Sequence, residues 1–587
     1  MCGILGTTQI LPRERFSKAL SLLSHRGPDD EGIVEHGASM LGHRRLSIID
    51  LSPLGHQPML SQDGNLALVF NGEIYNYRDL RRELEAEGVT FKSHSDTEVI
   101  LQGFGKHGNA YFSRLRGMWA LGISDKRTGT LTLSRDFFGI KPLYYRLDGE
   151  NCSFSSEAGP LVSLSGAEPD REAYSLYYIF GMMPGPATGI KGIKQLRPGE
   201  ILEVSADGKV ASSNLLDGNL LQAKPGQDLE AVLRDSVAKH FESDVPVSLL
   251  LSGGTDSSLI AALAKDLGFN PQCFHVAIEE SDDTRYAKRI AESLGLKLEV
   301  LGFSEKELVG SYDAVRNSLD LPLSDISLLP TSLVFGAVAK HTKVVLSGDG
   351  GDELFAGYYR HKKFAGARDA KSISLPALLP SPVLIRLQKA LDMWRKDLVG
   401  LYADEAAVIY LPKLRERAIK FLQEFRNTHP LAKIVPPELF FDLALYLPYM
   451  LMFKSDRMSM MHSLEARVPF VDREVCEAAF PLYAPGANET KAPLKEILAK
   501  HVPRELAYRP KQGFGFSAER FMSGRIQKDF LEAVRFHEQH AEAFGWDALQ
   551  LPSSNNAAFY QTLSQKFPRF AFGLITSHAV WQRYGLR

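Results

Sequence analysis

An apolar run stops at two adjacent glycines in the stretch LLLSGGTDSSLIAALAKDLG, residues 249–268, and a helical pattern starts directly after them. A strand, a glycine turn and a helix in this order are typical of a parallel α/β sheet, in which ligands bind at the carboxyl ends of strands. Glycines let the backbone pass close to a ligand, and the helix N-terminus favours anions. The stretch therefore predicts an anion site.

The loop SGGTDSS within this stretch has the composition of a phosphate-binding turn. It lacks the Lys-Ser/Thr ending with which a Walker loop holds β- and γ-phosphates. It carries an acid instead, and an acid beside phosphates requires a cation between them, such as Mg²⁺. A capped helix behind a tight turn is the alternative interpretation. The phosphate interpretation assigns ATP binding to Ser252, Gly253, Gly254, Asp256, Ser257 and Ser258, with Asp256 also binding the metal.

A second loop, LSGDGGDE at residues 346–353, again places Ser-Gly after an apolar run and adds the acids Asp349 and Asp352. Two such loops at the ends of two parallel strands predict one shared nucleotide–metal site. Two unrelated helix caps would also explain these residues, but the repeated combination of Ser-Gly with acids favours the shared site.

The 587 residues exceed what one compact core usually holds, so more than one domain is expected. Residues 1–205 alternate short strands with a few helices, which predicts an α+β domain with packed antiparallel sheets. Residues 206–227 are polar and weakly patterned and are interpreted as a linker. From residue 228, apolar strands alternate with helices, which predicts a doubly wound parallel sheet, and after about residue 365 helical patterns dominate to residue 587.

Composition excludes several function classes. The formal net charge is -2, which argues against a nucleic-acid footprint or a polybasic membrane contact. Four cysteines in a chain of this length do not make a disulfide framework. No secretory signal and no long uncharged apolar run is found. These features predict a cytoplasmic protein with small-molecule substrates and no nucleic-acid or membrane partner.

The second residue is a cysteine, Cys2. A thiol is an effective nucleophile only as a thiolate and therefore needs a base. If Met1 is removed, the α-amine of Cys2 becomes a base with a pKa near 8 in the same residue. A passive cysteine is the alternative for this feature taken alone.

Several motifs resemble known families. SHRGPDDEG, HRRLSIID, FNGEIYN and SHSDTEVI, between residues 24 and 100, resemble class II glutamine amidotransferases in order and spacing. SGGTDSS resembles the pyrophosphatase loop of ATP-pyrophosphatases. LSGDGGDELFAGY and SLEARVPFVD resemble the synthetase domain of glutamine-hydrolysing asparagine synthetases. The resemblance covers roughly residues 1–520 and implies an N-terminal nucleophile-type glutaminase domain followed by an ATP-pyrophosphatase domain.

The resemblance implies a glutamine pocket whose side chains suit amide hydrolysis. Asn71 and the N–H of Gly72 would form an oxyanion hole for the tetrahedral intermediate. Arg45 suits a bidentate hold on the glutamine α-carboxylate, and Asp96 would pair with the α-ammonium while Glu73 fixes the substrate. Backbone of Leu46, Ser47, Ile48 and Ile49 would line the same pocket.

The resemblance also assigns the synthetase site. Positions that hold ATP in asparagine synthetases are matched by Leu251, Val276, Ser347 and Gly348. Asp256 and Asp352 match acids that bind Mg²⁺-pyrophosphate. Asp349 matches an acid, often Glu, tied to forming the acyl-adenylate, and Lys495 matches a lysine close to the phosphates. The shorter Asp349 and the polar Thr255, where an apolar residue is usual, depart from the family pattern.

The implied activity is transfer of glutamine-derived ammonia to an acyl-adenylate, giving asparagine from aspartate with AMP and pyrophosphate. Two readings stay open beside it: the same mechanism on another carboxylate, such as a sugar uronate, and a non-catalytic glutamine or nucleotide sensor. Glu465 and Arg467 would complement an amino-acid acceptor or form a structural ion pair. GFGFSAERF, residues 513–521, would suit a sugar acid. Oligomeric state, a homodimer included, stays open.

Overall fold

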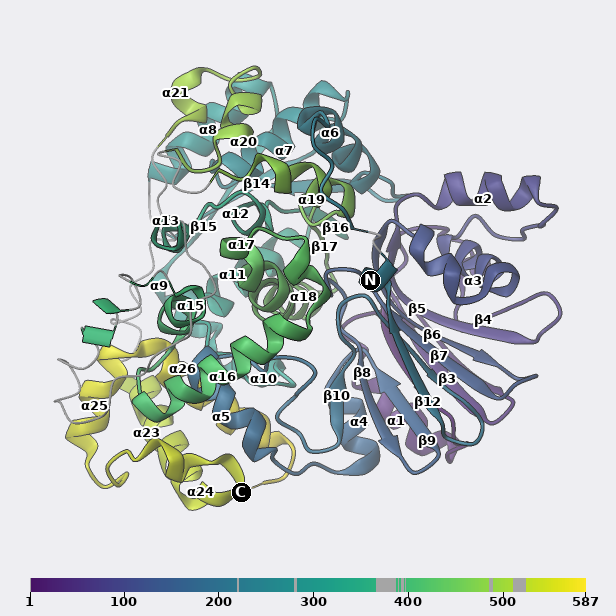
Figure 1. Ribbon diagram of the computed structural model, residues 1–587. Helices are drawn as coiled ribbons and strands as arrows, with labels where there is room; N and C mark the ends of the chain where they lie inside the picture. The colour runs from purple at the N-terminus through teal and green to yellow at the C-terminus, as the bar shows by residue number, and fades with distance from the viewer. Residues whose placement is uncertain are drawn as a thin grey trace.

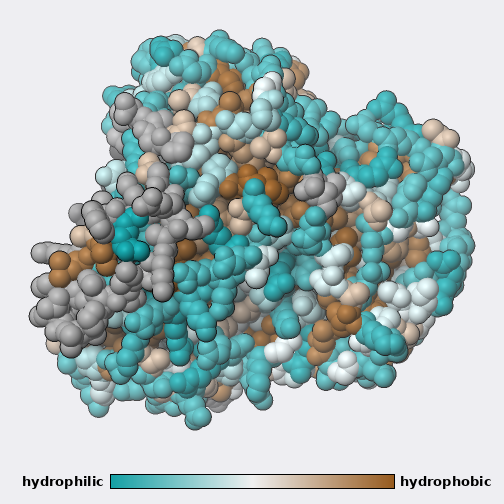
Figure 2. Space-filling view, viewed as in Figure 1, coloured by the Kyte–Doolittle hydropathy of each residue, from teal (hydrophilic) through white to brown (hydrophobic). Residues whose placement is uncertain are grey.

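The computed structural model describes residues 2–218, 221–278, 282–365, 387–388, 390–391, 395, 397–484, 489–509 and 524–586. Two lobes are seen in Figure 1, with the N-terminal sheets in purple and blue on the right and the later segments on the left. The face shown in Figure 2 is mostly hydrophilic, with hydrophobic residues gathered near its middle. Within the described ranges, no helix is long and apolar enough to cross a bilayer.

The N-terminal lobe is built from two antiparallel six-stranded sheets that pack face to face. Alternating apolar residues of both sheets, such as Ile4, Val69, Leu133 and Phe154, are buried between them. The first sheet has the order β10-β8-β9-β1-β3-β2 and the second β12-β11-β7-β6-β5-β4. Helices α1 and α4 pack against the first sheet, α3 packs against the second, and α2 packs against α3. The prediction of an α+β domain with packed antiparallel sheets is confirmed.

These strands are β1 (Gly3–Thr7), β2 (Asp30–His36), β3 (Ser39–Arg45), β4 (Met59–Leu60), β5 (Leu66–Ile74), β6 (Gly117–Asp125), β7 (Thr130–Arg135), β8 (Tyr144–Asp148), β9 (Asn151–Ser155), β10 (Ile193–Gln195), β11 (Glu200–Val204) and β12 (Val210–Asn214). The helices of this lobe are α1 (Arg13–Ser21), α2 (Tyr77–Ala86), α3 (Asp96–His107), α4 (Ala158–Ser165) and α5 (Arg171–Phe180).

The stretch interpreted as a linker from residue 206 is not structureless. Strand β12 pairs with β11 through a tight turn at Asp207 and Gly208, and Gly208 has φ +74°. An Asp-Gly pair between two short strands is a hairpin signal, because glycine accepts positive φ without strain. The sequence pattern did not predict β12, because this edge strand faces water and its residues show no apolar alternation.

The second lobe contains a five-stranded parallel sheet in the order β15-β14-β13-β16-β17. The chain moves outward from β13 through β14 to β15, then returns to the other side of β13 at β16. This reversal makes the sheet doubly wound and places a switch point between β13 and β16, where ligands bind in such sheets. The loops predicted to bind phosphate follow these two strands, so the fold brings them side by side.

The strands of this sheet are β13 (Val247–Leu250), β14 (Cys273–Ile278), β15 (Leu298–Phe303), β16 (Val344–Leu346) and β17 (Glu465–Arg467). The helices up to residue 364 are α6 (Leu229–His240), α7 (Thr255–Asp266), α8 (Asp282–Leu294), α9 (Glu305–Gly310), α10 (Tyr312–Ser318), α11 (Leu328–Val338), α12 (Gly351–Leu354) and α13 (Tyr359–Phe364).

The described residues after 396 are mainly helical, as predicted, with two differences. Strand β17 adds a fifth parallel strand, and residues 442–451 form a π-helix that contains Pro448. The helices are α15 (Leu398–Ala406), α16 (Pro412–Thr428), α17 (Pro437–Phe441), α18 (Met452–Met460), α19 (Arg473–Ala479), α20 (Ala492–Leu498), α21 (Arg504–Ala507), α23 (Gly524–Gln539), α24 (Ala541–Phe544), α25 (Ala557–Lys566) and α26 (Pro568–Arg583).

Candidate active sites

Cys2 lies directly before β1 and is 8% exposed. Its backbone N donates to Oδ1 of Asn71 at 2.9 Å, and its carbonyl accepts from Nε of Arg26 at 3.1 Å. Burial raises the pKa of the Cys2 thiol, against the lowering effects of a Leu46 backbone hydrogen bond and the Arg45 charge. The thiol is therefore protonated at neutral pH, and using it as a nucleophile requires a base.

Asn71 stands beside Cys2 on β5 and is fully buried. Its Oδ1 is held by Cys2, whereas its Nδ2 donor has no hydrogen-bond partner among the described residues. A buried donor without a partner is costly and is expected at a site that receives an acceptor from a ligand. The next residue must be small, because a Cβ on Gly72 would lie 2.1 Å from the carbonyl oxygen of Met118.

Arg45 ends β3, and its guanidinium is held by backbone carbonyls alone. It donates to the carbonyl oxygens of Asp50 at 2.5 Å and of Ile49 and Ser52 at 3.3 Å. Gly55 makes room for this packing, since a Cβ there would lie 2.0 Å from Nη2 of Arg45. No carboxylate of the described chain pairs with this cation, which leaves it able to bind an anionic group.

Asp96 opens helix α3 and is 4% exposed. Its Oδ2 accepts from the backbone N of Ile74 at 3.0 Å. Burial raises the pKa of Asp96 to about 6, against backbone hydrogen bonds from Ile74 and Thr97. The nearby charge of Glu465 acts in the same direction as burial. Asp96 is therefore a buried acid that titrates close to physiological pH.

One cavity unites these groups. Of the residues predicted to bind glutamine, Ser47 and Asn71 are not among those that line it, and Asn71 lies next to it through Cys2. Gln57 and Glu465 line it without having been predicted. Its lining comprises Cys2, Arg45, Leu46, Ile48, Ile49, Gly55, Gln57, Phe70, Gly72, Glu73, Ser95, Asp96, Thr97 and Glu465.

Glu465 and Arg467 were predicted either to complement the acceptor or to form a structural ion pair, and the structure shows the ion pair. Nη2 of Arg467 donates to Glu73 at 2.9 Å, and its Nε donates to Glu465 at 2.6 Å. The pair therefore lies at the boundary with the N-terminal lobe, beside the cavity of Cys2. The sequence could not reveal this, because the partner of Arg467 lies 394 residues away in the chain.

The loop after β13 has the geometry of an anion site. Oγ of Ser252 and Oγ of Ser257 lie 2.9 Å apart, and Gly254 caps α7. Gly253 has φ +74°, and a Cβ there would lie 2.7 Å from the backbone N of Ala287. The turn thus depends on glycine for both its conformation and its space.

The loop after β16 packs directly against the first loop. A Cβ on Gly348 would lie 2.9 Å from Cβ of Asp256, and one on Gly351 would lie 2.6 Å from Oδ1 of Asp256. Gly350 has φ +92°, which glycine alone adopts readily. The glycines of GDGG therefore let the second loop close over Asp256, so the two loops lie against each other.

A lysine missed by the sequence analysis lies between the two acids. Nζ of Lys491 is 2.5 Å from Asp256 and 2.6 Å from Asp352, and the side chain is 7% exposed. Lys495, predicted to approach the phosphates, instead pairs with Glu489. The signal was present, because Lys491 precedes Lys495 by one helical turn in KAPLK, but only the fold shows which lysine meets the acids.

The two acids fit a magnesium site that a phosphate would complete. Among the described residues, no group of three or more His, Cys, Asp or Glu side chains could hold a metal by itself. Mg²⁺ usually takes one or two carboxylates and fills its remaining positions with water and phosphate oxygens. Asp256 and Asp352 converge on one cation, the Lys491 ammonium, which supports their joint use as cation ligands.

Asp349 follows Ser347 in the same loop and is held by hydroxyls. Oγ of Ser347 donates to it at 3.0 Å and Oγ of Ser455 at 3.5 Å. Burial raises the pKa of Asp349, against the charge of Lys454. Lys454 in turn donates to Asp325 at 3.0 Å. This cluster ends at a cavity lined by Phe180, Met182, Asp325, Arg360, Tyr402, Glu405, Ala406, Tyr446, Met450 and Arg569.

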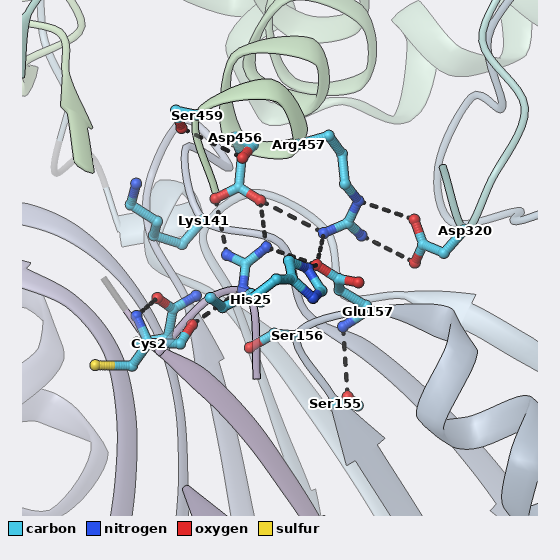
Figure 3. A network of polar contacts seen from close by, with 12 residues as sticks. Cys2, His25, Lys141, Ser155, Ser156, Glu157, Asp320, Asp456, Arg457 and Ser459 are labelled. Carbon is cyan, nitrogen blue, oxygen red and sulfur yellow. Dashed lines mark hydrogen bonds and ion pairs between the residues drawn. The ribbon is translucent and has the colours of Figure 1, made fainter. Parts of the chain in front are cut away.

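A buried ionic network lies beside Cys2, as Figure 3 shows. Arg26 donates to Asp456 at 2.8 and 3.0 Å and to Glu157 at 2.9 Å. Arg457 donates to the same oxygen of Glu157 at 2.9 Å. The Sγ atom of Cys2 points away from this network in the picture. Cys2 is nevertheless attached to it through its carbonyl and Arg26.

The far end of this network belongs to the second lobe. Arg457 makes a two-point contact with Asp320, at 2.8 and 2.9 Å. Helix α18 therefore presents Ser455 to Asp349 and the next two residues, Asp456 and Arg457, to the network. Both lobes contribute buried charges to one connected cluster.

Comparison with known proteins accounts for both lobes. A glutamine amidotransferase domain model matches residues 1–214, and an asparagine synthase model matches residues 228–551. Asparagine synthetase (glutamine-hydrolyzing) 1 of Bacillus subtilis (strain 168) is 33% identical, covering 88% of this chain and 87% of its own. Amidase chyE of Penicillium rubens (strain ATCC 28089 / DSM 1075 / NRRL 1951 / Wisconsin 54-1255) is 27% identical, covering 85% and 81%.

Among solved structures, glutamine phosphoribosylpyrophosphate amidotransferase from Bacillus subtilis is 19% identical, covers 59% of this chain and 75% of its own, and has a TM-score of 0.29. The two family models and the extent of the Bacillus relative decide the assignment. The chain belongs to the glutamine-hydrolysing asparagine synthetase family, with a glutamine amidotransferase domain followed by an asparagine synthase domain.

Proposed function

We propose that the protein hydrolyses glutamine at Cys2 and transfers the ammonia to a carboxylate that it activates with ATP in the second lobe. The observation that carries this proposal is the Nδ2 donor of Asn71, which is buried next to Cys2 and has no hydrogen-bond partner in the part of the chain that the structure describes. Arg45 and Asp96 supply opposite charges in the adjoining cavity, as the α-carboxylate and α-ammonium of glutamine require.

In the proposed glutaminase step, Sγ of Cys2 attacks the carboxamide carbon and its proton passes to the α-amine of Cys2. Nδ2 of Asn71 and the N–H of Gly72 receive the oxyanion. The amine then returns the proton to the departing nitrogen, ammonia leaves, and water hydrolyses the thioester to glutamate. The hydrogen bond from Cys2 N to Oδ1 of Asn71 supports this geometry, because it turns Nδ2 away from the amine.

In the proposed synthetase step, the backbone and hydroxyls of Ser252–Ser258 and of the Ser347–Gly351 loop bind the phosphates of ATP. Asp256 and Asp352 would hold Mg²⁺, which neutralises phosphate charge when bound. The acceptor carboxylate displaces pyrophosphate, and ammonia then displaces AMP. The absence of a Walker lysine supports pyrophosphate rather than single-phosphate release. Purified protein given ATP, glutamine and acceptor should form AMP, and ADP formation would contradict the proposal.

For the acceptor we favour aspartate. The cavity beyond Asp349 carries both charge signs, with Asp325 bound to Lys454 and with Arg569, whose Nε donates to the carbonyl oxygen of Ser324 at 3.4 Å. Arg569 could hold an α-carboxylate and Asp325 an α-ammonium. Tyr402 and Tyr446 in the same lining would also suit a sugar ring, so a uronate is the second candidate. Residues 513–521 lie outside the described ranges.

A competition assay decides between these acceptors. Aspartate and a panel of uronates and nucleotide-sugar acids are offered together, and AMP release and amide products are measured. Stimulation by aspartate supports asparagine synthesis. Stimulation by a sugar acid alone would exclude aspartate as the acceptor and leave the two-site mechanism intact. If no acid stimulates AMP release and no glutamate is formed, the result would favour a non-catalytic sensor.

Arg569→Met is expected to raise the KM for aspartate at least about tenfold, because a charged hydrogen bond worth about 1.5–3 kcal/mol is lost. Glutamine hydrolysis without acceptor should be unchanged. Arg583→Met is the matched control, since Arg583 lies on the same helix and donates to the backbone carbonyl of Asn317 rather than lining the cavity. Equal KM values for aspartate in wild type and Arg569→Met would show that Arg569 does not bind the acceptor.

Asn71→Ala is expected to lower glutaminase kcat about 10²- to 10³-fold, as the loss of an oxyanion donor does elsewhere. The glutamine KM should change less, because Nδ2 meets charge that develops only in the transition state. Steady-state release of glutamate gives both constants. A larger effect on KM than on kcat would make Asn71 a ground-state binding residue.

Glutaminase kcat/KM should show an ionisation near pH 6 and fall below it. Burial raises the pKa of Asp96 to about 6, and protonation removes the negative charge that would attract the glutamine ammonium. At saturating glutamine the bound ammonium should keep Asp96 ionised, so kcat should lack this ionisation. Initial rates between pH 5 and 8 test this, and a kcat/KM profile without the extra ionisation would contradict it.

A further inference from the structure

Arg467 is a second-lobe residue that binds two of the carboxylates lining the glutamine cavity. Its side chain is 0% exposed, and every branch of its guanidinium is engaged. Nε donates to Glu465 at 2.6 Å, and Nη2 donates to Glu73 at 2.9 Å. Nη1 donates to the carbonyl oxygens of His240 at 2.8 Å and Glu242 at 2.6 Å, at the end of α6. Four of the five N–H donors of the guanidinium therefore have acceptors, which holds the side chain in place.

The backbone of the same residue supports the synthetase site. Arg467 pairs with Leu346 in the β16–β17 ladder, and its carbonyl oxygen accepts from the backbone N of Ser347 at 2.9 Å. Ser347 opens the second nucleotide loop, and its Oγ holds Asp349 at 3.0 Å. Arg467 thus binds two lining carboxylates of the glutamine cavity with its side chain and the start of the synthetase loop with its main chain.

Once glutamine is bound, Glu73 lies near two cationic groups, the Arg467 guanidinium and the α-ammonium of glutamine. It lines the cavity, where it would help to fix the substrate, and it is the carboxylate of the N-terminal lobe that binds Arg467. A buried guanidinium cannot lose a carboxylate without a large cost, so a shift of Glu73 toward glutamine must draw Arg467 with it. A shift of Arg467 in turn acts on the strand that holds Ser347.

We propose that Arg467 is a positioning residue that couples the two active sites, so that glutamine in the first lobe and nucleotide with acceptor in the second each strengthen binding of the other. This inference rests on the proposed glutaminase and synthetase functions. Coupling between two sites is reciprocal, so an effect of nucleotide on glutamine affinity requires an equal effect of glutamine on nucleotide affinity. The glutamine KM is the convenient readout, because it can be measured with and without ATP and acceptor.

The experiment uses the full-length protein and the variant Arg467→Lys, which keeps the charge but cannot contact Glu465, Glu73 and two carbonyls together. In wild type, ATP and acceptor should lower the glutamine KM at least about fivefold. In Arg467→Lys this response should disappear and the basal KM should rise. Pyrophosphate release with ammonium salts as nitrogen donor should stay within about threefold of wild type, because it bypasses the glutamine cavity.

Arg116→Lys is the matched control. Arg116 is also a buried arginine of the boundary, 6% exposed on its side chain, and it binds Asp472 at 2.7 Å without touching either cavity. It should keep the KM response. The inference is overturned if wild type shows no response, if Arg467→Lys keeps it, or if Arg116→Lys loses it equally.

If Arg467→Lys does not fold, Glu465→Gln takes its place. It removes one charge from Arg467 while leaving the contact with Glu73, and it should reduce the KM response. An unchanged response in this variant would also overturn the inference. Failure of the proposed function gives a different result, namely a wild-type protein that releases no glutamate from glutamine.

Discussion

Cys2→Ala is expected to abolish glutamine-dependent amide synthesis and to leave synthesis from ammonium salts intact. Loss of a covalent nucleophile lowers the rate on the order of 10⁴-fold or more. The ammonium-dependent reaction persists because Cys2 serves only the first cavity, away from the loops at β13 and β16. Release of glutamate and of pyrophosphate, measured separately with each nitrogen donor, gives the two rates.

Cys152→Ala is the control for this experiment. Cys152 is a buried thiol of the same lobe, packed between its sheets, and its loss should cost about 1 kcal/mol of stability without touching the cavity. It should keep both activities. Glutamate release that survives in Cys2→Ala would assign the nucleophile to another residue. Wild-type protein that retains Met1 should resemble Cys2→Ala, since its base is then an amide.

Asp256→Asn and Asp352→Asn are each expected to lower pyrophosphate release at least about 100-fold, with either nitrogen donor. Each replacement removes half of the carboxylate pair that would bind Mg²⁺, and the two acids lie within 2.6 Å of the same lysine ammonium. Basal glutamine hydrolysis, measured without ATP and acceptor, should continue. A magnesium titration should show a raised requirement for the metal in both variants.

Asp266→Asn is the matched control for these variants. Asp266 ends helix α7, whose first turn contains Asp256, but its side chain is 47% exposed and pairs with Arg234 on the surface. It should change neither activity. Wild-type rates of synthesis in both Asp256→Asn and Asp352→Asn would show that other residues bind the metal.

The sequence was sufficient wherever function depends on short stretches of chain. The loop after β13 and the loop after β16 were placed correctly at neighbouring strands, because glycine, acid and apolar run follow one another locally. Arg45, Gly72 and Asp96, which the motifs predicted to bind one substrate, line one cavity. Patterning of this kind predicts elements well when one face is buried and the other is not.

The sequence was insufficient where charged residues are buried against distant partners. Strand β17 reads Glu-Ala-Arg, a polar pattern, yet all three residues are buried because Arg467 satisfies Glu465 and Glu73 together. Lys491 was overlooked for a related reason, since its acids lie in loops more than 130 residues earlier. Ion pairs between remote segments leave no periodic signal, so only the fold reveals them.

The buried network of Arg26, Glu157, Asp456 and Arg457 limits how these two lobes can be recombined. An exchange of one lobe for that of a relative would leave buried charges without partners unless the other lobe changed in step. Leaving one buried charge unpaired costs about 3–5 kcal/mol, a large share of the stability of most domains. Chimaeras should therefore fold only when residues 26, 157, 456 and 457 come from the same parent. Neither lobe can then be exchanged independently of the other.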